Sequence, residues 1–475
     1  MSNKDPHHLH LATPPPGTHE RCAALSYCWG SVYDNSYLTT AANLQQRRKG
    51  FSADSLPRSI REAVHVTQRL GLRFLWVDAI CILQGTDEVA RGDWRAESGR
   101  MADVYSLATV TILAAAADHC NGGLAYGTAC RIFDGSEEAR QLVQLDLTGG
   151  LLLEGETRTL APKTAINTRA WTLQEQILSL RILLFTSNGL GWLRGRGRVL
   201  PPGSKRDIPG KYNPLLFLRK EEPLQKLSQD LMSSYTRRKL SKPEDKLPAL
   251  ATVARTIHTL KHVNYLAGLW EENLLAQLTW KTNDTSVIPR AAKRRPPGYR
   301  APSWSWMSLD AAVSLRHEQL DADNPRLASK IESCCVSLVD PKNPFGQVMG
   351  GVLTIRGPTV RVTRVQGEGN VPSDSGPECY AMFGQREYQL GHALFDTPRD
   401  EAETRLALEA SLTHIVALFI RHNSKTNDTY GLILSATSKE KGNQYRRIGA
   451  LHWGNWRPDP RIPSKKLPFD RVMII

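Results

Sequence analysis

The sequence predicts an α/β fold, a parallel sheet with helices on both faces, followed by a helical region and a β-rich C-terminal part. Apolar runs of strand length occur at 23–27, 74–83, 109–115 and 182–185. Amphipathic helical patterns at 57–70 and 93–108 separate the first three runs. Strand, helix and strand in this order predict right-handed crossovers and parallel pairing. Beyond residue 301, alternating stretches at 352–356, 415–420 and 431–434 indicate a meander or barrel instead.

Length and composition indicate a globular protein of more than one domain. The chain has 475 residues, of which 41% are hydrophobic and 23% are charged. The sequence contains no apolar run near the roughly 20 residues that a membrane span needs, and its first residues lack the apolar core of a signal peptide. We therefore expect a cytoplasmic protein without a membrane span, although a nuclear location stays open.

The formal charge of +14 raises the question of a nucleic-acid partner. The basic residues cluster at 194–198, 237–239 and 293–295, in segments that look like linkers, and no nucleic-acid-binding motif accompanies them. We interpret them as solvated charge and do not predict a nucleic-acid partner. The eight cysteines form no CxxC pair, so the sequence predicts no metal site.

Composition shifts divide the chain into six segments. We predict a disordered tail at 1–20, an α/β domain at 21–195 and a basic Pro/Gly linker at 196–222. The α/β domain has an insertion at about 125–165 that contains a hairpin. A helical region at 223–285, with a new helix opening at Tyr265, leads into a basic linker at 286–300 and the β-rich region at 301–475.

Asp78 is an unusual residue in the apolar run 74–83, which is predicted to be a strand buried on both faces. A carboxylate is costly to bury unless it is paired or lies at the wet end of the strand. Two interpretations stay open. Asp78 either lines a ligand crevice or forms a hydrogen-bonded link to a neighbouring loop.

Trp171 and Glu175 lie four residues apart in a predicted helix, so both side chains project from one face. An aromatic ring beside a carboxylate could hold a flat, cationic or sugar-bearing ligand. However, Thr172 and Glu175 also fit the capping-box pattern, in which the two side chains bond to free amides at a helix start. The sequence leaves both interpretations open.

Several segments together resemble the fungal heterokaryon incompatibility (HET) domain, in their order and spacing as well as their residues. They are ALSYCWG at 24–30, LWVDAICI at 75–82, Met101 to Tyr105, and RAWTLQE at 169–175 followed by Leu178 and Ser179. Members of this family are implicated in non-self recognition and programmed cell death in filamentous fungi. The resemblance therefore implies a similar role, with other incompatibility proteins or copies of the same chain as partners.

The HET domain is also distantly similar to TIR domains, which implies a TIR/flavodoxin-like sheet and NAD as a substrate rather than as a cofactor. TIR enzymes carry a Trp-Cys-x-x-Glu pattern, and Trp171 to Glu175 reproduces its spacing with Thr172 in place of cysteine. The resemblance therefore implies that Glu175 is a catalytic carboxylate. By their placement, Trp29 or Trp171 could stack on the nicotinamide ring, Ser26 could bind the ribose or a phosphate, and Asp78 could lie across the crevice.

A non-catalytic signalling module is the alternative function. A Glu175 side chain beside Trp29 and Ser26 would favour catalysis, whereas a Glu175 folded onto its own helix terminus would favour the module.

Overall fold

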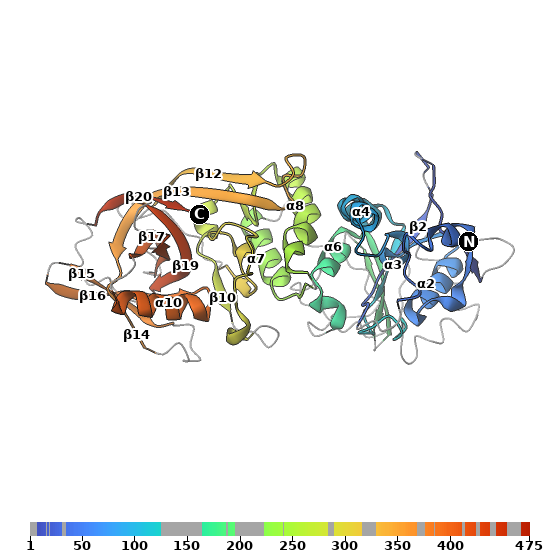
Figure 1. Ribbon diagram of the computed structural model, residues 1–475, viewed down its shortest axis with the longest axis horizontal. Coiled ribbons are helices and arrows are strands. Elements are labelled where there is room, and N and C mark those ends of the chain that lie inside the picture. Colours follow the sequence, from blue (N-terminus) through green and yellow to red (C-terminus); the bar gives the residue numbers. More distant parts are fainter. Residues whose placement is uncertain are drawn as a thin grey trace, which may run out of the picture. The chain divides into compact units, whose positions relative to one another are not determined.

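The structure is a computed structural model that describes residues 7–15, 17–18, 20–30, 35–124, 164–186, 189–194, 223–240, 242–283, 289–315, 329–367, 376–383, 385–410, 414–423, 428–437, 443–453 and 467–475. The chain divides into two compact units, residues 1–219 and residues 220–475. Each unit is described separately below, and Figure 1 shows the elements of both.

A five-stranded sheet forms the centre of the N-terminal unit, within the part of it that is described. Its order is β4 (Phe74–Trp76), β2 (Cys22–Ser26), β5 (Val110–Ala114), β6 (Arg181–Thr186) and β7 (Gly189–Arg194). The first four strands in this order are parallel, and β7 is antiparallel to β6. The predicted parallel sheet is therefore confirmed, with one reversed strand at its edge that the sequence analysis did not predict.

Helices cover both faces of this sheet, as predicted. On one face, Leu25 of β2 shares a core with Ile60 of α2 (Arg58–Arg69). On the other face, Ala24 packs with Tyr105 of α4 (Glu88–Leu107) and with Leu178 of α6 (Trp171–Leu178). Successive residues of β2 thus face opposite helix layers, as the two-residue period of a strand requires. Figure 1 shows α2 on one side of the strands and α4 and α6 on the other.

The predicted strand at 74–83 is wrong beyond Trp76. Strand β4 stops there, and Asp78–Cys81 forms the short helix α3. Strand β4 lies at the sheet edge and its residues are only partly buried, so it is not the doubly covered strand that the apolar run suggested. An apolar run has the same appearance in a buried strand and in a buried helix, which explains the error.

The predicted disordered tail at 1–20 contains an ordered element. His8–Leu9 (β1) pairs antiparallel with Phe51–Ser52 (β3), and Leu9 is buried against the core of α2. The amide of Leu11 donates a hydrogen bond of 2.8 Å to Arg47 O. Alternating apolar residues hold this segment, despite its otherwise polar composition. Most of the predicted insertion at 125–165 lies outside the described residues. Its predicted hairpin and the predicted linker at 196–222 lie outside them entirely.

The predicted helical region begins as expected but contains a hairpin. Helices α7 (Leu224–Tyr235) and α8 (Pro248–Lys261) are present. The helix expected from Tyr265 is instead an antiparallel pair, β8 (Tyr265–Leu266) and β9 (Leu269–Trp270). Its two turn residues, Ala267 and Gly268, have φ of 46° and 104°, which is the positive-φ combination of a tight hairpin turn. A short helix, α9 (Leu274–Gln277), and a small sheet of β10 (Lys281–Asn283) with β11 (Ala312–Ser314) follow.

The C-terminal unit is β-rich, as predicted. Its large sheet has nine described strands, and β12, β13, β17, β18, β19, β16, β15 and β14 follow one another in that order, while β20 pairs with β13 and β19. In chain order they are β12 (Lys330–Leu338), β13 (Val348–Arg361), β14 (Arg364–Gln366), β15 (Glu378–Phe383), β16 (Arg386–Phe395), β17 (Ile415–Asn423), β18 (Asp428–Ala436), β19 (Gln444–Trp453) and β20 (Phe469–Ile474). Strands β13, β17, β18, β19 and β20 pair in a closed cycle, which makes a small barrel. Helix α10 (Pro398–Glu409) contacts β16 and β19.

The predicted solvated linker at 286–300 is wrong for Lys293 and Arg295, whereas Arg294 is exposed as predicted. Arg295 Nη2 lies 3.1 Å from Asp396 Oδ2 and 3.3 Å from Asp400 Oδ2. Lys293 is buried, and its Nζ lies 3.4 Å from Thr282 Oγ1. The carboxylates that pair with Arg295 lie about a hundred residues further along the chain. Local charge clustering could not reveal them.

Candidate functional site

The candidate residues gather at the carboxyl ends of the central strands of the N-terminal unit. Ser26 ends β2, Trp29 follows in the next loop, and Asp78 follows the neighbouring strand β4 after one residue. The chain passes from β2 to β4 on one side of β2 and then to β5 on the other. Such a reversal of strand order separates the loops that leave β2 and β5, and open α/β sheets bind their ligands there.

Glu175 projects from α6 into this region and is only 6% exposed. Burial is the main cause that raises the pKa of its carboxyl group to about 7, and the negative charge of Asp78 acts in the same direction. The hydroxyls of Ser26 and Tyr105 and the positive charge of Arg169 act in the opposite direction and lower this pKa. Glu175 therefore titrates near neutral pH, where a carboxyl group can exchange a proton with a substrate.

Two polar atoms of the site lack a hydrogen-bond partner within the described part of the chain. They are Glu175 Oε2 and Ser26 Oγ, which are both buried. Ser26 lies close enough to Glu175 to lower its pKa, but the two atoms do not reach hydrogen-bond geometry. Buried polar groups are normally satisfied, and an exception calls for a functional or structural explanation. Both atoms could bond to a ligand that enters between them.

The capping box of α6 is not formed. The helix begins after Ala170, which makes no side-chain capping bond, and the Thr172 hydroxyl donates to Ile166 O and, over 2.9 Å, to Arg169 O. At the other end of α6, Ser179 Oγ donates to Glu175 O over 2.6 Å and lies 2.6 Å from Thr111 Oγ1 of β5. The carboxylate of Glu175 is thus not folded onto its own helix terminus.

Asp78 forms the link to a neighbouring loop that was one of its two interpretations. Trp29 Nε1 donates to Asp78 Oδ2 over 3.0 Å, and the amide of Ala79 donates to Asp78 Oδ1 over 2.7 Å. Burial raises the pKa of Asp78, and the charge of Arg169 is the main influence that lowers it. Because Asp78 also raises the pKa of Glu175, it lies within electrostatic reach of that carboxylate.

Trp171 is the first residue of α6, and its side chain packs against α4. Its ring meets the ring of Trp94 edge to face, with centroids 6.1 Å apart and planes at 88°. It also packs against the buried cluster that includes Ala24 and Tyr105. Of the predicted site residues, Ser26, Asp78 and Glu175 therefore lie close to one another, and Trp29 is bonded to Asp78. Trp171 lies apart from them, in the packing between α6 and α4.

Arg169 and Tyr105 also belong to this site, and neither was predicted from the sequence. Arg169 Nη1 donates to Tyr27 O over 3.0 Å, and its charge lowers the pKa of both Asp78 and Glu175. Tyr105 OH donates to Leu25 O over 3.0 Å and interacts with Glu175. Both residues lie inside the segments that carry the HET resemblance, which was the available signal.

Two other chemistries find no support among the described residues. Burial raises the pKa of the Cys28 thiol to about 11, so this thiol stays protonated at neutral pH and is a poor nucleophile. No group of three or more His, Cys, Asp or Glu side chains in the described segments could hold a metal ion. Likewise, none of the described helices combines the length and apolar character needed to cross a bilayer.

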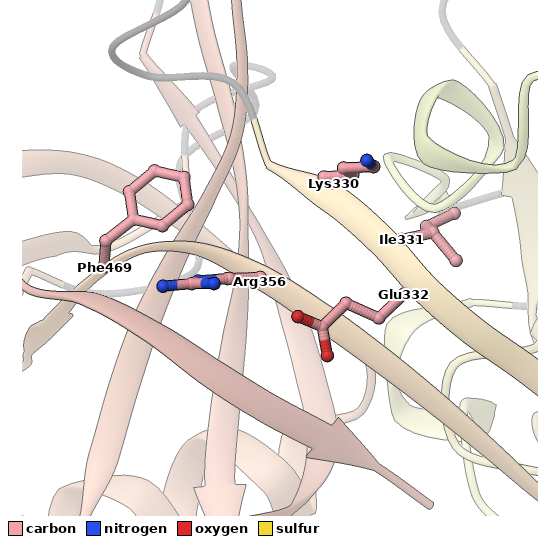
Figure 2. Close-up of a pocket in the computed structure, with 5 residues that line it drawn as sticks. All are labelled: Lys330, Ile331, Glu332, Arg356 and Phe469. Carbon is pink, nitrogen blue, oxygen red and sulfur yellow. The ribbon is translucent and has the colours of Figure 1, made fainter.

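The C-terminal unit has a broad, shallow hollow whose lining residues are mostly exposed to water. It measures about 680 Å³ and is lined by Lys330, Ile331, Glu332, Arg356 and Phe469. Figure 2 shows that Glu332 and Arg356 come from neighbouring strands and that Phe469 lies beside Arg356. Four of these residues are exposed and Ile331 is partly buried, so water screens their charges.

Comparison with known families supports the resemblance for part of the chain. Residues 23–175 match the family model described as heterokaryon incompatibility protein (HET). We call them the HET-like region. It begins in β2 and ends at Glu175, so it contains Ser26, Trp29, Asp78 and Arg169 as well. No curated protein and no solved structure shows a significant match to the chain. The HET match suggests a function in heterokaryon incompatibility.

Proposed function

We propose that this protein acts in heterokaryon incompatibility by TIR-like cleavage of NAD, with Glu175 as the catalytic carboxylate. The observation that carries the proposal is the buried Glu175 side chain, which has an unpartnered oxygen beside Ser26 and a pKa near 7. The strand order supports it, because the first four strands of the sheet in chain order are parallel and lie in the spatial order 2-1-3-4, as in flavodoxin-like sheets. Loss of NAD would then account for programmed cell death.

In the proposed reaction, water attacks C1′ of the ribose while the bond from C1′ to the nicotinamide nitrogen breaks. The bonding electron pair passes to that nitrogen and neutralises its positive charge. Glu175, as the carboxylate, stabilises the positive charge that develops on the ribose and accepts the proton that the water loses. Ser26 donates a hydrogen bond to the sugar, and Arg169 supplies positive charge for the diphosphate. The products are nicotinamide and ADP-ribose.

An assay of nicotinamide release from NAD by the full chain tests this proposal. Glu175→Gln keeps the shape of the side chain but removes the base, and we expect it to lower the rate by at least about a hundredfold. Glu88→Gln is the matched control, because Glu88 is in the same HET-like region with a side chain that is 73% exposed. This control should keep the wild-type rate. A folded Glu175→Gln protein with the wild-type rate would refute the catalytic role.

A non-catalytic module that assembles with copies of itself or with other incompatibility proteins is the second candidate. The Trp29 to Asp78 hydrogen bond favours it, because both side chains already serve as a structural link. The near-complete burial of Glu175 favours it as well. In that case wild-type protein releases no nicotinamide at any concentration, while light scattering shows an assembled species.

A further inference from the structure

A cavity in the C-terminal unit combines apolar walls with an excess of positive charge. It measures about 350 Å³ and lies against the end of α7, the turn of 3-10 helix at Pro243–Lys246 (η6) and the segment 291–311. Small-molecule sites have volumes of about 300–1,000 Å³ and mostly apolar walls. The apolar walls of this cavity include Leu240, Pro243 and Ala311.

Four cationic residues line the same cavity against one carboxylate. The cations are Arg238, Lys239, Lys246 and Arg294, and the carboxylate is Asp310. Asp310 is already engaged, because its oxygens lie 2.8 Å from Arg300 Nη2 and 3.6 Å from Arg294 Nε. Asp310 is thus shared by two guanidinium groups, whereas Lys239 and Lys246 form no ion pair within the described residues, so an anion in the cavity would reduce the repulsion between the lining cations.

Lys246 adds a buried amine to this arrangement. The residue is 5% exposed, and its Nζ donates to Leu309 O, the one hydrogen-bond acceptor that it has among the described residues. An ammonium group has three donors, so two stay available. Burial is the main cause that lowers the pKa of Lys246 to about 7, the charge of Arg300 lowers it further, and Asp310 opposes both. A negative group nearby would restore the ammonium form.

We propose that this cavity binds a small organic molecule that carries a phosphate group on an apolar body. The cationic residues hold the phosphate, and the apolar walls take the body. A phosphate fits better than a carboxylate because it carries up to two negative charges and offers several acceptor oxygens to donors on different segments. This site lies in a different unit from Glu175 and does not depend on the proposed function.

Calorimetric titration of the full chain with AMP, adenosine and inorganic phosphate tests the proposal. We expect AMP to bind at least tenfold more tightly than either of the other two, because only AMP joins a phosphate to an aromatic face that can pack on the apolar walls. Adenosine binding as tight as AMP binding would overturn the anion requirement. Phosphate binding as tight as AMP binding would overturn the requirement for an apolar body, and no AMP binding at millimolar concentration would overturn the site itself.

Two charge reversals in one turn locate the binding. Lys239→Glu changes an exposed residue that lines the cavity, whereas Arg237→Glu makes the same charge change at an exposed residue that is not among its lining residues. We expect Lys239→Glu to weaken AMP binding at least fivefold and Arg237→Glu to alter it less than twofold. Lys239→Gln should give an intermediate loss and guards against misfolding of the reversal. Equal effects at 237 and 239, or AMP binding that survives Lys239→Glu unchanged, would refute this location.

Discussion

Burying the Glu175 carboxylate near Asp78 costs the folded protein free energy whenever both groups are ionised. The same burial gives Glu175 a pKa suited to proton transfer at neutral pH. The buried Glu175 carboxylate caps no helix and has one oxygen without a hydrogen-bond partner among the described residues. Its contribution to packing alone does not offset the free energy that its burial costs. This cost is the physical basis for the proposed catalytic role of Glu175.

The raised pKa of Glu175 leads to a stability prediction. The carboxyl titrates near its ordinary value of 4.5 in the unfolded chain and at about 7 in the folded chain, so the folded state binds the extra proton between these values. This contribution to stability is complete below about pH 4.5 and is lost as the pH rises through 7. It amounts to roughly 3 kcal/mol at most.

Glu175→Gln removes that titration. We therefore expect the free energy of unfolding of the variant, relative to wild type, to increase between pH 5 and pH 8, as measured by urea denaturation at both values. The exposed Glu88→Gln change should give the same difference at both. A Glu175→Gln difference that does not change with pH would mean that the carboxyl titrates at its ordinary pKa in the folded protein.

The candidate site was only partly visible in the sequence for a physical reason. Local patterns identified Asp78 in its apolar run and Glu175 by its spacing from Trp171, whereas the roles of Ser26, Trp29 and Glu175 at a nucleotide site were implied only by the HET and TIR resemblance. Tyr105 reaches Leu25 O across 80 residues, and Arg169 reaches Tyr27 O across 142. Such contacts exist only after the sheet has formed. Sequence spacing therefore could not assign their roles.

At the scale of the elements, the spacing of apolar residues correctly predicted the regular helices and strands of the N-terminal sheet. Helix α2 has an apolar stripe, and strands β2, β5 and β6 are short apolar runs that the structure confirms. The errors fall where backbone conformation changes inside an apolar stretch. Helix α3 follows β4 after one residue, and the hairpin of β8 and β9 interrupts a helical pattern. Two residues at positive φ, Ala267 and Gly268, decide that hairpin, and only the glycine is an obvious turn signal.

The hairpin turn gives a matched pair of substitutions. A Cβ at Gly268 would lie 2.8 Å from Met307 Cγ and would also meet the strained φ of 104°. We expect Gly268→Ala to lower the free energy of unfolding by about 1–3 kcal/mol. Ala267 has φ of 46°, so Ala267→Gly relieves backbone strain in the folded state. It also raises the conformational entropy of the unfolded chain, which opposes this gain. We therefore expect its free energy of unfolding to change by less than about 1 kcal/mol. Urea denaturation of both variants checks this, and equal losses would contradict the assigned turn.

At the scale of the whole molecule, each unit has a core and a network of its own. In the C-terminal unit, Arg447 and Asp396 are both fully buried and lie 3.2 Å apart. Arg447 also donates to Leu278 O and Trp280 O, each over 2.6 Å, and so connects β19 to the segment beside β10. Arg295 joins the same carboxylate. A buried ion network of this kind is costly to break from one side, because the remaining charge stays buried without a partner.

Asp396→Ala should therefore destabilise residues 220–475 by about 3–5 kcal/mol. Hydrogen exchange followed by mass spectrometry should show faster exchange in peptides from β16 and β19, with peptides from β2 and β5 unchanged. The control Arg399→Ala removes a pair with Glu403 whose side chains are 86% and 46% exposed, and it should leave exchange in the same peptides unchanged. Faster exchange across both units after Asp396→Ala would contradict independent cores.

Helix α6 is held at both ends, by Thr172 at its start and by Ser179 at its end. Because Ser179 bonds to the carbonyl of Glu175 itself and to Thr111 of β5, the backbone at Glu175 cannot shift without breaking the tie between helix and sheet. These bonds hold the backbone of Glu175 and leave its side-chain torsions unrestrained, so the carboxylate can change position by side-chain rotation alone. A shift of α6 along the sheet would instead cost the Ser179–Thr111 hydrogen bond, so α6 and β5 have to move as one body if either moves.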